Sequence, residues 1–458
     1  GIGDVCDDDC DPFPDGTAAV MNNPATLALM PSDNRFDLAL GKLGPDVSAS
    51  IQGAPAANSS ADAFYMPAVG YAGKASGLTY GFGIFGQGGM GTEYGPNSWM
   101  GDPSQGANSA LTEGLTNRSE VSVGRFILPL AMDLTPKFRI ATSLDFVWAG
   151  MDLQMAMSKA QFEDLVTTQN AGQASGSFVN AFGQLYQPFG GTGVQDLYHA
   201  YFDFSNSNDF TGEATGTGFA TKLGMVYQVT DRFTVGATYH SKTNLSDLET
   251  SNADMNIGVS MDTGIAGGGA PSGTYQDMNI PVSGKITVRN FQWPETYGVG
   301  GAFKVNDRFM VVGDIKRINW SDVMKNFSMT FDADNVASNG GFAGLSLDAT
   351  LFQNWKDQTV YSAGAAYQVI DPLTLRVGFN YADNPIPDTY LNALFPAIVT
   401  THYTVGAGYA INRASSVDLA VSVAPEVEAT NPGNPPNIPA VTSKHSQTSW
   451  QVMYSYRF

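Results

Sequence analysis

Charged residues are scarce in this chain. Asp, Glu, Lys and Arg together make up 14% of its 458 residues, whereas soluble domains contain about a quarter. The formal net charge is −20, which argues against a nucleic-acid partner because nucleic acids attract basic patches. Few charges, together with 51 glycines and 11% aromatic residues, suit a wall that faces lipid.

The sequence also lacks a long hydrophobic run. A membrane-spanning helix needs roughly 18 or more consecutive apolar residues. The nearest candidate, Phe126 to Leu134, is interrupted by Pro129 and Asp133. Any segment that crosses a membrane is therefore predicted to be a strand.

Familiar catalytic motifs are missing as well. The chain has no G-x-S-x-G elbow, phosphate-binding loop or H-E-x-x-H motif, and we predict that it is not an enzyme. A Ser–His hydrolase on the same scaffold stays open as an alternative, because such residues need not be adjacent in sequence. The only histidines are His199, His240, His402 and His445.

Cysteine is limited to Cys6 and Cys10, which enclose three aspartates. A disulfide that closes this small loop is the preferred interpretation over two free thiols, as in an oxidising compartment. The start at Gly1, without a methionine or an apolar leader, fits a processed and exported protein.

The same acidic stretch offers oxygen ligands for a bound Ca²⁺. Its spacing does not match an EF-hand loop, and a solvated acidic tail is the alternative. We expect no other cofactor. The carboxylates concerned are Asp4, Asp7, Asp8, Asp9 and Asp11.

The C-terminal stretch, Ser449 to Phe458, alternates between two kinds of side chain. The same alternation occurs over residues 233–240, 373–381 and 403–411. This period of two predicts strands with one apolar face, and a soluble sandwich or β-helix is the alternative. On the last strand the apolar face consists of Trp450, Val452, Tyr454, Tyr456 and Phe458.

Two kinds of connection separate the predicted strands. Six are short turns with Asp, Asn, Gly or Pro: residues 74–77, 133–137, 230–232, 306–308, 370–372 and 412–414. Seven are long: about residues 53–63, 91–117, 158–211, 250–280, 332–354, 384–399 and 425–443. Their strict alternation predicts an all-β fold, a 14-stranded antiparallel transmembrane β-barrel over residues 35–458. Residues 1–34 are interpreted as a plug or a tail.

The longest connection, residues 158–211, carries an apolar stripe at helical spacing. A shorter stripe lies upstream, at Phe162, Leu165 and Val166. We expect a short helical hairpin here. Its apolar surface either forms a small satellite core or faces outward as a groove for a hydrophobic ligand. The groove would consist of Phe178, Val179, Phe182, Leu185, Tyr186 and Phe189.

The third predicted strand contains an unusual density of glycine. Glycines weaken the strand pairing that they join, and they mark a bulge, a bend or a gap in the wall. A plain tight corner is the alternative. The residues are Gly86, Gly88, Gly89 and Gly91.

Four segments resemble the FadL long-chain fatty acid transporters of Gram-negative outer membranes. They occur in the family's order: Asn23-Pro24-Ala25, Gly218 to Lys242, Pro294 to Ser321, and Leu375 to Tyr390. The resemblance implies a fourteen-stranded barrel with the N-terminal segment folded inside as a hatch, of which Asn23, Pro24 and Ala25 are the motif. It also implies capture of substrate at external loops, hatch-gated transfer, and sideways exit through a gap at the third strand.

The chain departs from the family before this motif. An acidic stretch, Cys6 to Pro14, replaces a Gly- and Ala-rich one that contains an Arg, and no basic residue precedes Arg35. A substrate carboxylate would have to meet lumen residues such as Lys222 or Arg376. The departure slightly favours monoaromatic hydrocarbons over long-chain fatty acids.

We therefore predict a passive uptake channel in the bacterial outer membrane, with a hydrophobic small molecule as substrate. Outer-membrane lipid and lipopolysaccharide are the other expected partners, and we expect a monomer. A general aqueous porin is a further alternative, which a folded hatch in the lumen would disfavour.

Overall fold

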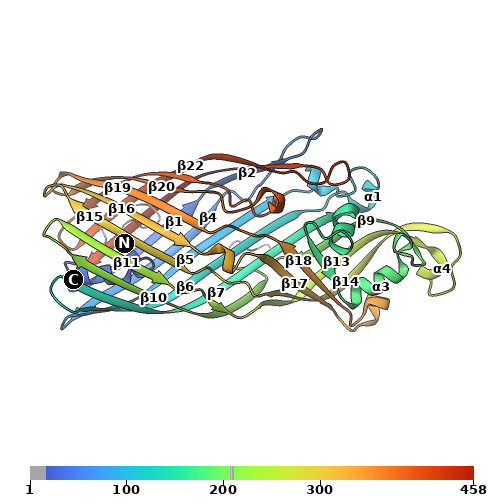
Figure 1. The fold of residues 1–458 in the computed structure, drawn as a ribbon, viewed down its shortest axis with the longest axis horizontal. Coiled ribbons are helices and arrows are strands. Elements are labelled where there is room, and N and C mark those ends of the chain that lie inside the picture. Colours follow the sequence, from blue (N-terminus) through green and yellow to red (C-terminus); the bar gives the residue numbers. More distant parts are fainter. Residues whose placement is uncertain (1–16, 207, 209–210) are drawn as a thin grey trace.

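The computed structural model describes residues 17–206, 208 and 211–458 (Figure 1). Twenty-three strands of these residues belong to a single antiparallel sheet. Helices are few and short, and among the described residues none is long and apolar enough to cross a membrane.

The sheet closes into a ring. Within the ring, each strand pairs with the strand beside it. The last strand of the chain pairs with the first, for example through Arg457 opposite Arg35. In ring order the strands are β1 (Asn34–Leu43), β4 (Phe64–Ala75), β5 (Leu78–Tyr94), β6 (Asn117–Asp133), β7 (Phe138–Ser158), β10 (Ala214–Gln228), β11 (Phe233–His240), β15 (Thr296–Lys304), β16 (Phe309–Ile318), β19 (Gln358–Ile370), β20 (Leu373–Ala382), β21 (Thr401–Ala410), β22 (Ser415–Asn431) and β23 (Val441–Arg457).

The six predicted short turns are confirmed, since each joins two neighbouring strands of this ring. In the first of them Ser76 and Gly77 have φ values of 53° and 79°, a conformation that glycine tolerates best. The C-terminus lies at the same end of the molecule, opposite α4 (Thr263–Ala266) (Figure 1).

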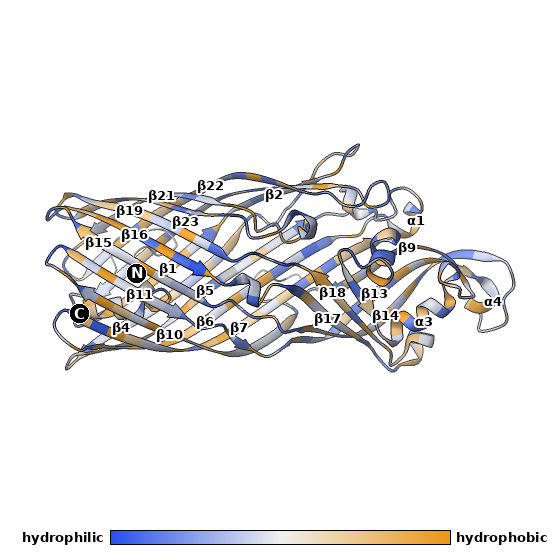
Figure 2. Ribbon diagram, viewed as in Figure 1, coloured by the Kyte–Doolittle hydropathy of each residue, from blue (hydrophilic) through white to orange (hydrophobic). Residues whose placement is uncertain are grey.

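The ring places apolar side chains outside and polar side chains inside. In β7, Leu144 is 56% exposed while its neighbour Asp145 is completely buried. In β23 the predicted apolar face is exposed, whereas Ser455 is buried. Orange apolar residues are spread along the ring strands in Figure 2. Such an inverted surface is stable only where lipid covers it.

A second group of strands extends the wall away from the C-terminus. The far end of β7 leaves its partner β10 and pairs with β9 (Val194–Phe204). From there the pairing continues through β13 (Leu248–Asp262), β14 (Tyr275–Arg289), β17 (Asn326–Ala333), β18 (Ser346–Phe352) and β8 (Gly172–Ser175). Three short strands complete the sheet: β2 (Pro45–Ser50), β3 (Ala57–Asn58) and β12 (Asn244–Leu245).

Two helices cover this extension, α2 (Lys159–Val166) and α3 (Ser177–Leu185). They lie where the helical hairpin is predicted. The ring centroids of Phe162 and Phe182 are 5.7 Å apart. We call strands β8, β9, β13, β14, β17 and β18 with these helices the distal lobe. The remaining helices are α1 (Ser109–Thr112) and the 3-10 turns η1 (Thr17–Val20), η2 (Pro24–Leu29), η3 (Trp99–Gly101), η4 (Gln187–Phe189), η5 (Trp320–Asp322), η6 (Ala337–Phe342) and η7 (Asp388–Tyr390).

The predicted number of fourteen strands is too low for the sheet as a whole. Connections that were expected to be loops, within residues 158–211, 250–280 and 332–354, contain β8, β9 and β18 and parts of β13, β14 and β17. These strands pair mostly with one another. Their sequences are rich in Asp, Asn, Ser and Gly, so local patterning hides strands that distant partners stabilise.

Candidate functional site

The described part of the N-terminal segment, residues 17–33, packs against the ring strands. Its buried side chains Val20, Leu27 and Met30 contact β4 and β6, while Ala25 and Ala28 cluster with residues of β6, β7, β10, β15 and β16. These contacts involve strands from different parts of the ring at once.

Asn23 of the predicted hatch motif binds both its own helical turn and the wall. Its side-chain oxygen accepts a hydrogen bond from the Ala25 amide at 3.1 Å, which caps η2. Its side-chain nitrogen donates to the carbonyls of Met225 and Ala237, each at 3.3 Å. Pro24 occupies the start of η2, where its missing N–H is tolerated. An amide is needed here because it donates and accepts at once.

Gly224 makes room for this contact. A Cβ on Gly224 would lie 2.1 Å from the side-chain oxygen of Asn23. Further wall side chains bind the segment through its carbonyls. Thr238 donates to Asn22 at 3.3 Å, and the Lys74 ammonium donates to Ala28 at 2.9 Å.

A buried ion cluster lies in the lumen. Arg125 pairs with Asp145 at 2.7 Å, and Lys222 pairs with the same carboxylate. Ser143 donates to the other oxygen of Asp145 at 2.7 Å. Arg376, on the other side of the ring, pairs with Asp418 at 2.7 Å. The two cations proposed to meet a substrate carboxylate, Lys222 and Arg376, are therefore both engaged by protein carboxylates.

The pairing between β4 and β5 is incomplete. It runs from Ala75–Leu78 to Val69–Ile84 and then stops, although both strands continue. Residues 64–68 of β4 still pair with β1, and β5 still pairs with β6 up to Tyr94. Beyond the break, Ser60 donates its amide to the Glu93 carbonyl at 2.8 Å. We call residues 64–68 and 85–92 the β4–β5 interruption.

The predicted glycine cluster lies in this interruption. The register of β5 against β6 shifts between Gly86 and Gly88, which is the bulge that glycines at this density predict. Two side chains of β4 reach across the break. A Cβ on Gly86 would lie 2.6 Å from Cε of Met66, and one on Gly91 would lie 2.7 Å from Cζ of Phe64.

The bulge is fixed by the ion cluster. Gln87, between the two shifted positions, accepts a hydrogen bond from Nε of Arg125. Arg125 is 1% exposed and is itself held by Asp145. The shape of β5 at the interruption thus depends on a buried salt bridge from β6 and β7.

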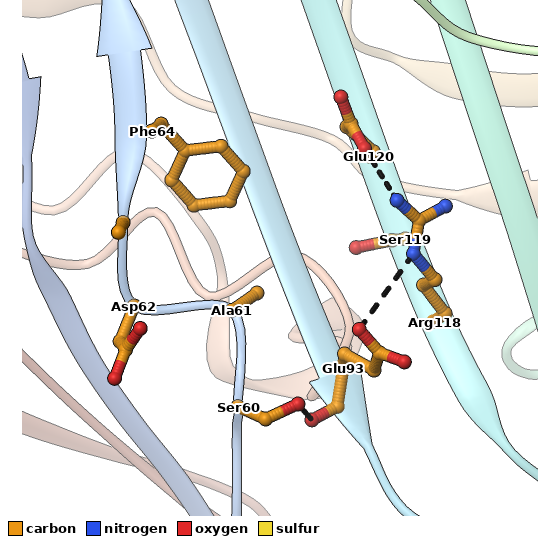
Figure 3. Close-up of a pocket in the computed structure, with 9 residues that line it drawn as sticks. Ser60, Ala61, Asp62, Phe64, Glu93, Arg118, Ser119 and Glu120 are labelled. Atoms are coloured by element: carbon orange, nitrogen blue, oxygen red, sulfur yellow. Dashed lines mark hydrogen bonds and ion pairs between the residues drawn. The ribbon is translucent and has the colours of Figure 1, made fainter. Parts of the chain in front are cut away.

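A polar cavity of about 240 Å³ borders the interruption (Figure 3). Its one arginine, Arg118, pairs with Glu120 at 2.6 Å and lies 3.9 Å from Glu93. A further nitrogen of Arg118 forms a salt bridge with Asp152 at 2.5 Å. The lining residues are Ser60, Ala61, Asp62, Ala63, Phe64, Glu93, Arg118, Ser119 and Glu120.

The apolar stripe of α3 is not an open groove. Phe178, Val179, Phe182 and Tyr186 are buried in the distal lobe, and Phe178 stacks on Phe342 at 4.4 Å. Leu185 and Phe189 pack against the same cluster and stay partly buried. These residues therefore form a small satellite core, which is the alternative to an outward groove. The apolar stripe packs against strands of the distal lobe that were not predicted from the sequence.

An inward-folded loop, residues 391–398, was interpreted from sequence only as part of a long external connection. Leu391, Leu394 and Ile398 are buried. Carbonyl oxygens of the loop accept hydrogen bonds from three ring strands, β5, β6 and β23. The signal that was available is its composition, L-N-A-L-F-P-A-I, which is too apolar for a solvated loop.

Other predicted residues lie outside the described part of the chain. These are Cys6 and Cys10, proposed to form a disulfide, and the acidic residues proposed to bind Ca²⁺. Among the described residues, no group of three or more His, Cys, Asp or Glu is arranged to hold a metal ion.

A closed antiparallel barrel with an apolar outer face and a polar interior is typical of outer-membrane proteins. The family model described as "Outer membrane protein transport protein (OMPP1/FadL/TodX)" matches residues 11–434. The chain belongs to this family, as the four sequence segments predict. The family is one of transport channels, in agreement with the prediction that the chain is not an enzyme.

Two toluene transporters of known structure resemble the whole chain. The Pseudomonas putida transporter TodX superimposes with a TM-score of 0.77 at 28% identity, covering 97% of this chain and 94% of its own. The Ralstonia pickettii transporter TbuX gives 0.72 at 29% identity with the same coverage. The long-chain fatty acid transport protein of Escherichia coli is 24% identical over 251 residues, 52% of this chain and 50% of the relative. The chain spans about half the length of the curated relatives that it matches.

Proposed function

We propose that the protein is a passive uptake channel for small hydrophobic molecules, which leave sideways through the wall at the β4–β5 interruption. A continuous cluster of buried apolar side chains supports the route. It extends from Phe178 in the distal lobe to Val123, Val147 and Tyr94 on the ring strands β6, β7 and β5. A hydrophobic molecule can follow this cluster from the lobe to the strand that borders the interruption.

The observation that carries the proposal is the interruption itself. Lipid satisfies no backbone hydrogen bond, so a barrel wall normally pairs every strand along its length. Here β4 and β5 part, and the side chains of Phe64 and Met66 occupy the break. Side-chain rotation opens such a break without rupture of strand pairing. Transfer into the lipid is then favoured by about 25 cal/mol per Å² of apolar surface that leaves water.

The N-terminal segment is proposed to act as the hatch. Besides the bonds that the Lys74 ammonium donates to the carbonyls of Ala28 and Met30, its attachment includes neutral hydrogen bonds from wall side chains to Asn22 and from Asn23 to wall carbonyls. Each such bond contributes only about 1 kcal/mol, so the segment can shift when a substrate arrives. The apolar contacts of Ala25 and Ala28 involve small side chains.

A neutral aromatic molecule is the preferred substrate over a fatty acid. The lumen cations Lys222 and Arg376 are paired with Asp145 and Asp418, and a fatty acid carboxylate would have to compete with them. Two similar transporters of nearly complete coverage, those of Pseudomonas putida and Ralstonia pickettii, are described as toluene transporters. We further propose that the protein works as a monomer surrounded by outer-membrane lipid and lipopolysaccharide.

Uptake in cells tests the proposal. Cells without their own transporter would express the chain and receive labelled toluene or a labelled long-chain fatty acid. Faster uptake of toluene alone is the expected result. Faster uptake of the fatty acid alone would keep the channel and change its substrate. No increase for either, with steady ion conductance or ester cleavage instead, would favour a porin or a hydrolase.

A further inference from the structure

The inward loop, residues 391–398, is bound to the ring through consecutive carbonyl groups. Tyr94 of β5 donates its hydroxyl to the Ala393 carbonyl at 2.9 Å. Thr92 of β5 donates to the Leu394 carbonyl at 2.9 Å, and Ser119 of β6 donates to the same oxygen. Both hydroxyl groups are buried. The position of the loop is thus fixed through its backbone carbonyl groups. No substitution of a side chain in the loop removes them.

A further contact holds the loop on the opposite side of the interruption. Nδ1 of His445, on β23, donates to the Pro396 carbonyl at 2.7 Å. In the ring, β23 is followed by β1, β4 and then β5. The loop is therefore attached to strands on both sides of the β4–β5 interruption and spans its inner side.

Side chains of the loop pack into the apolar cluster that includes residues of the lobe and of the ring. Leu394 and Phe395 belong to the apolar cluster that reaches from the distal lobe to the ring, and the ring of Phe395 lies 6.3 Å from that of Phe327 on β17. The loop thus lies between the lobe and the strand that borders the interruption, on the route inferred for the substrate.

We propose that residues 391–398 form a second gate, distinct from the N-terminal segment, which limits the size of the molecules that reach the β4–β5 interruption. Thr92, Tyr94 and Ser119 are positioning residues that hold this gate closed. The inference rests on the proposed transport function and adds a size filter to it. Release of the loop widens the passage, because Leu394 and Phe395 then withdraw from it.

A double substitution, Thr92→Val with Ser119→Ala, tests the gate. It removes both hydroxyls that bind the Leu394 carbonyl and keeps the side-chain volumes nearly unchanged. The matched control is Thr404→Val with Ser422→Ala, the same chemical change at a buried hydroxyl pair of β21 and β22 that does not touch the loop. Loop position is read from Ala393→Cys, labelled with a water-soluble maleimide in a Cys6→Ser/Cys10→Ser background.

The loss of two ordinary hydrogen bonds shifts a local equilibrium roughly thirtyfold, so we expect labelling of Ala393→Cys to quicken by about that factor in the gate variant only. Uptake of the fatty acid relative to toluene should rise several-fold in the same variant. Unchanged labelling, or faster labelling with an unchanged uptake ratio, overturns the gate. If the wild-type chain raises uptake of neither molecule, the transport function itself fails, and labelling still reports separately whether the hydroxyls hold the loop.

Discussion

The ring wall exposes apolar side chains of the kind that the distal lobe encloses, and β7 passes through both. In the wall, Leu144 and Phe146 are exposed while Asp145 is buried. In the lobe half of the same strand, Met151, Asp152 and Leu153 are all buried. The surroundings of the strand change between the two parts, and its partner changes from β10 to β9. Lipid accepts apolar side chains from the wall, whereas the lobe has to enclose its own apolar core.

Removal of the buried negative charge in the wall should lower the free energy of unfolding more than any other change proposed here. Asp145→Asn leaves Arg125 and Lys222 buried side by side without a counter-charge. We expect the free energy of unfolding to fall by about 3–5 kcal/mol, measured by urea titration in lipid vesicles. The control Asp418→Asn breaks a partly exposed pair and should lower it by about 1 kcal/mol. Equal effects would mean that the lumen is as solvated as the surface.

The lobe should respond to loss of an apolar side chain instead. Phe178→Ala removes a buried ring that stacks on Phe342, and we expect local destabilisation of about 3 kcal/mol. Hydrogen exchange should quicken in β17 and β18 and stay unchanged in β5 and β6. Phe219→Ala, at a ring that is 57% exposed on β10, serves as the control. Faster exchange throughout the ring would show that wall and lobe unfold as one unit.

The interruption can be blocked from the outer side of the wall. Gly86→Trp places an indole where Met66 now reaches, and we expect uptake to fall roughly tenfold, a change of about 1.4 kcal/mol in the barrier. Gly313→Trp adds the same bulk to β16, where an added Cβ would meet only the Ser362 carbonyl oxygen, at 3.7 Å, and should leave uptake unchanged. If both variants transport normally, exit through this part of the wall is refuted.

Acidification should weaken the lobe. Burial lowers the pKa of His199, on β9, to about 4. The unfolded chain therefore takes up a proton first as the pH falls below about 6.5, and stability is lost between about pH 6.5 and 4. We expect a loss of about 1 kcal/mol by pH 5.5, measured by hydrogen exchange in β9 and β13. In the His199→Gln variant, the stability of the lobe should depend less on pH. An unchanged slope of stability against pH would assign the pH dependence to other groups.

Local patterns in the sequence predicted the wall well. The alternation on β23 and the six short turns follow from side-chain period and turn residues, and both are confirmed. The glycine cluster predicted a bulge, which lies between Gly86 and Gly88. Asn23 was singled out by resemblance, and the structure supplies the reason in its contacts with Ala25 and the wall.

The strands of the distal lobe were not predicted, because they pair with strands that are distant in the sequence. The strand β8 follows α2 in the chain yet pairs with β18, far along the sequence. The apolar stripe of α3 suggested an outward groove only while these strands were unknown. The inward loop gave a compositional signal, but its direction depends on Thr92, Ser119 and His445, which belong to three different strands.

The sequence by itself determined that this chain forms strands with an apolar face, where the short turns lie, and to which family it belongs. Those features are local, because each depends on residues only a few positions apart. The tertiary structure alone decided that β4 and β5 part beyond Ile84, that Arg125 holds Gln87, and that the inward loop spans the interruption. Each of these requires side chains that are distant in the chain to meet inside a closed ring, and no local pattern specifies such a meeting.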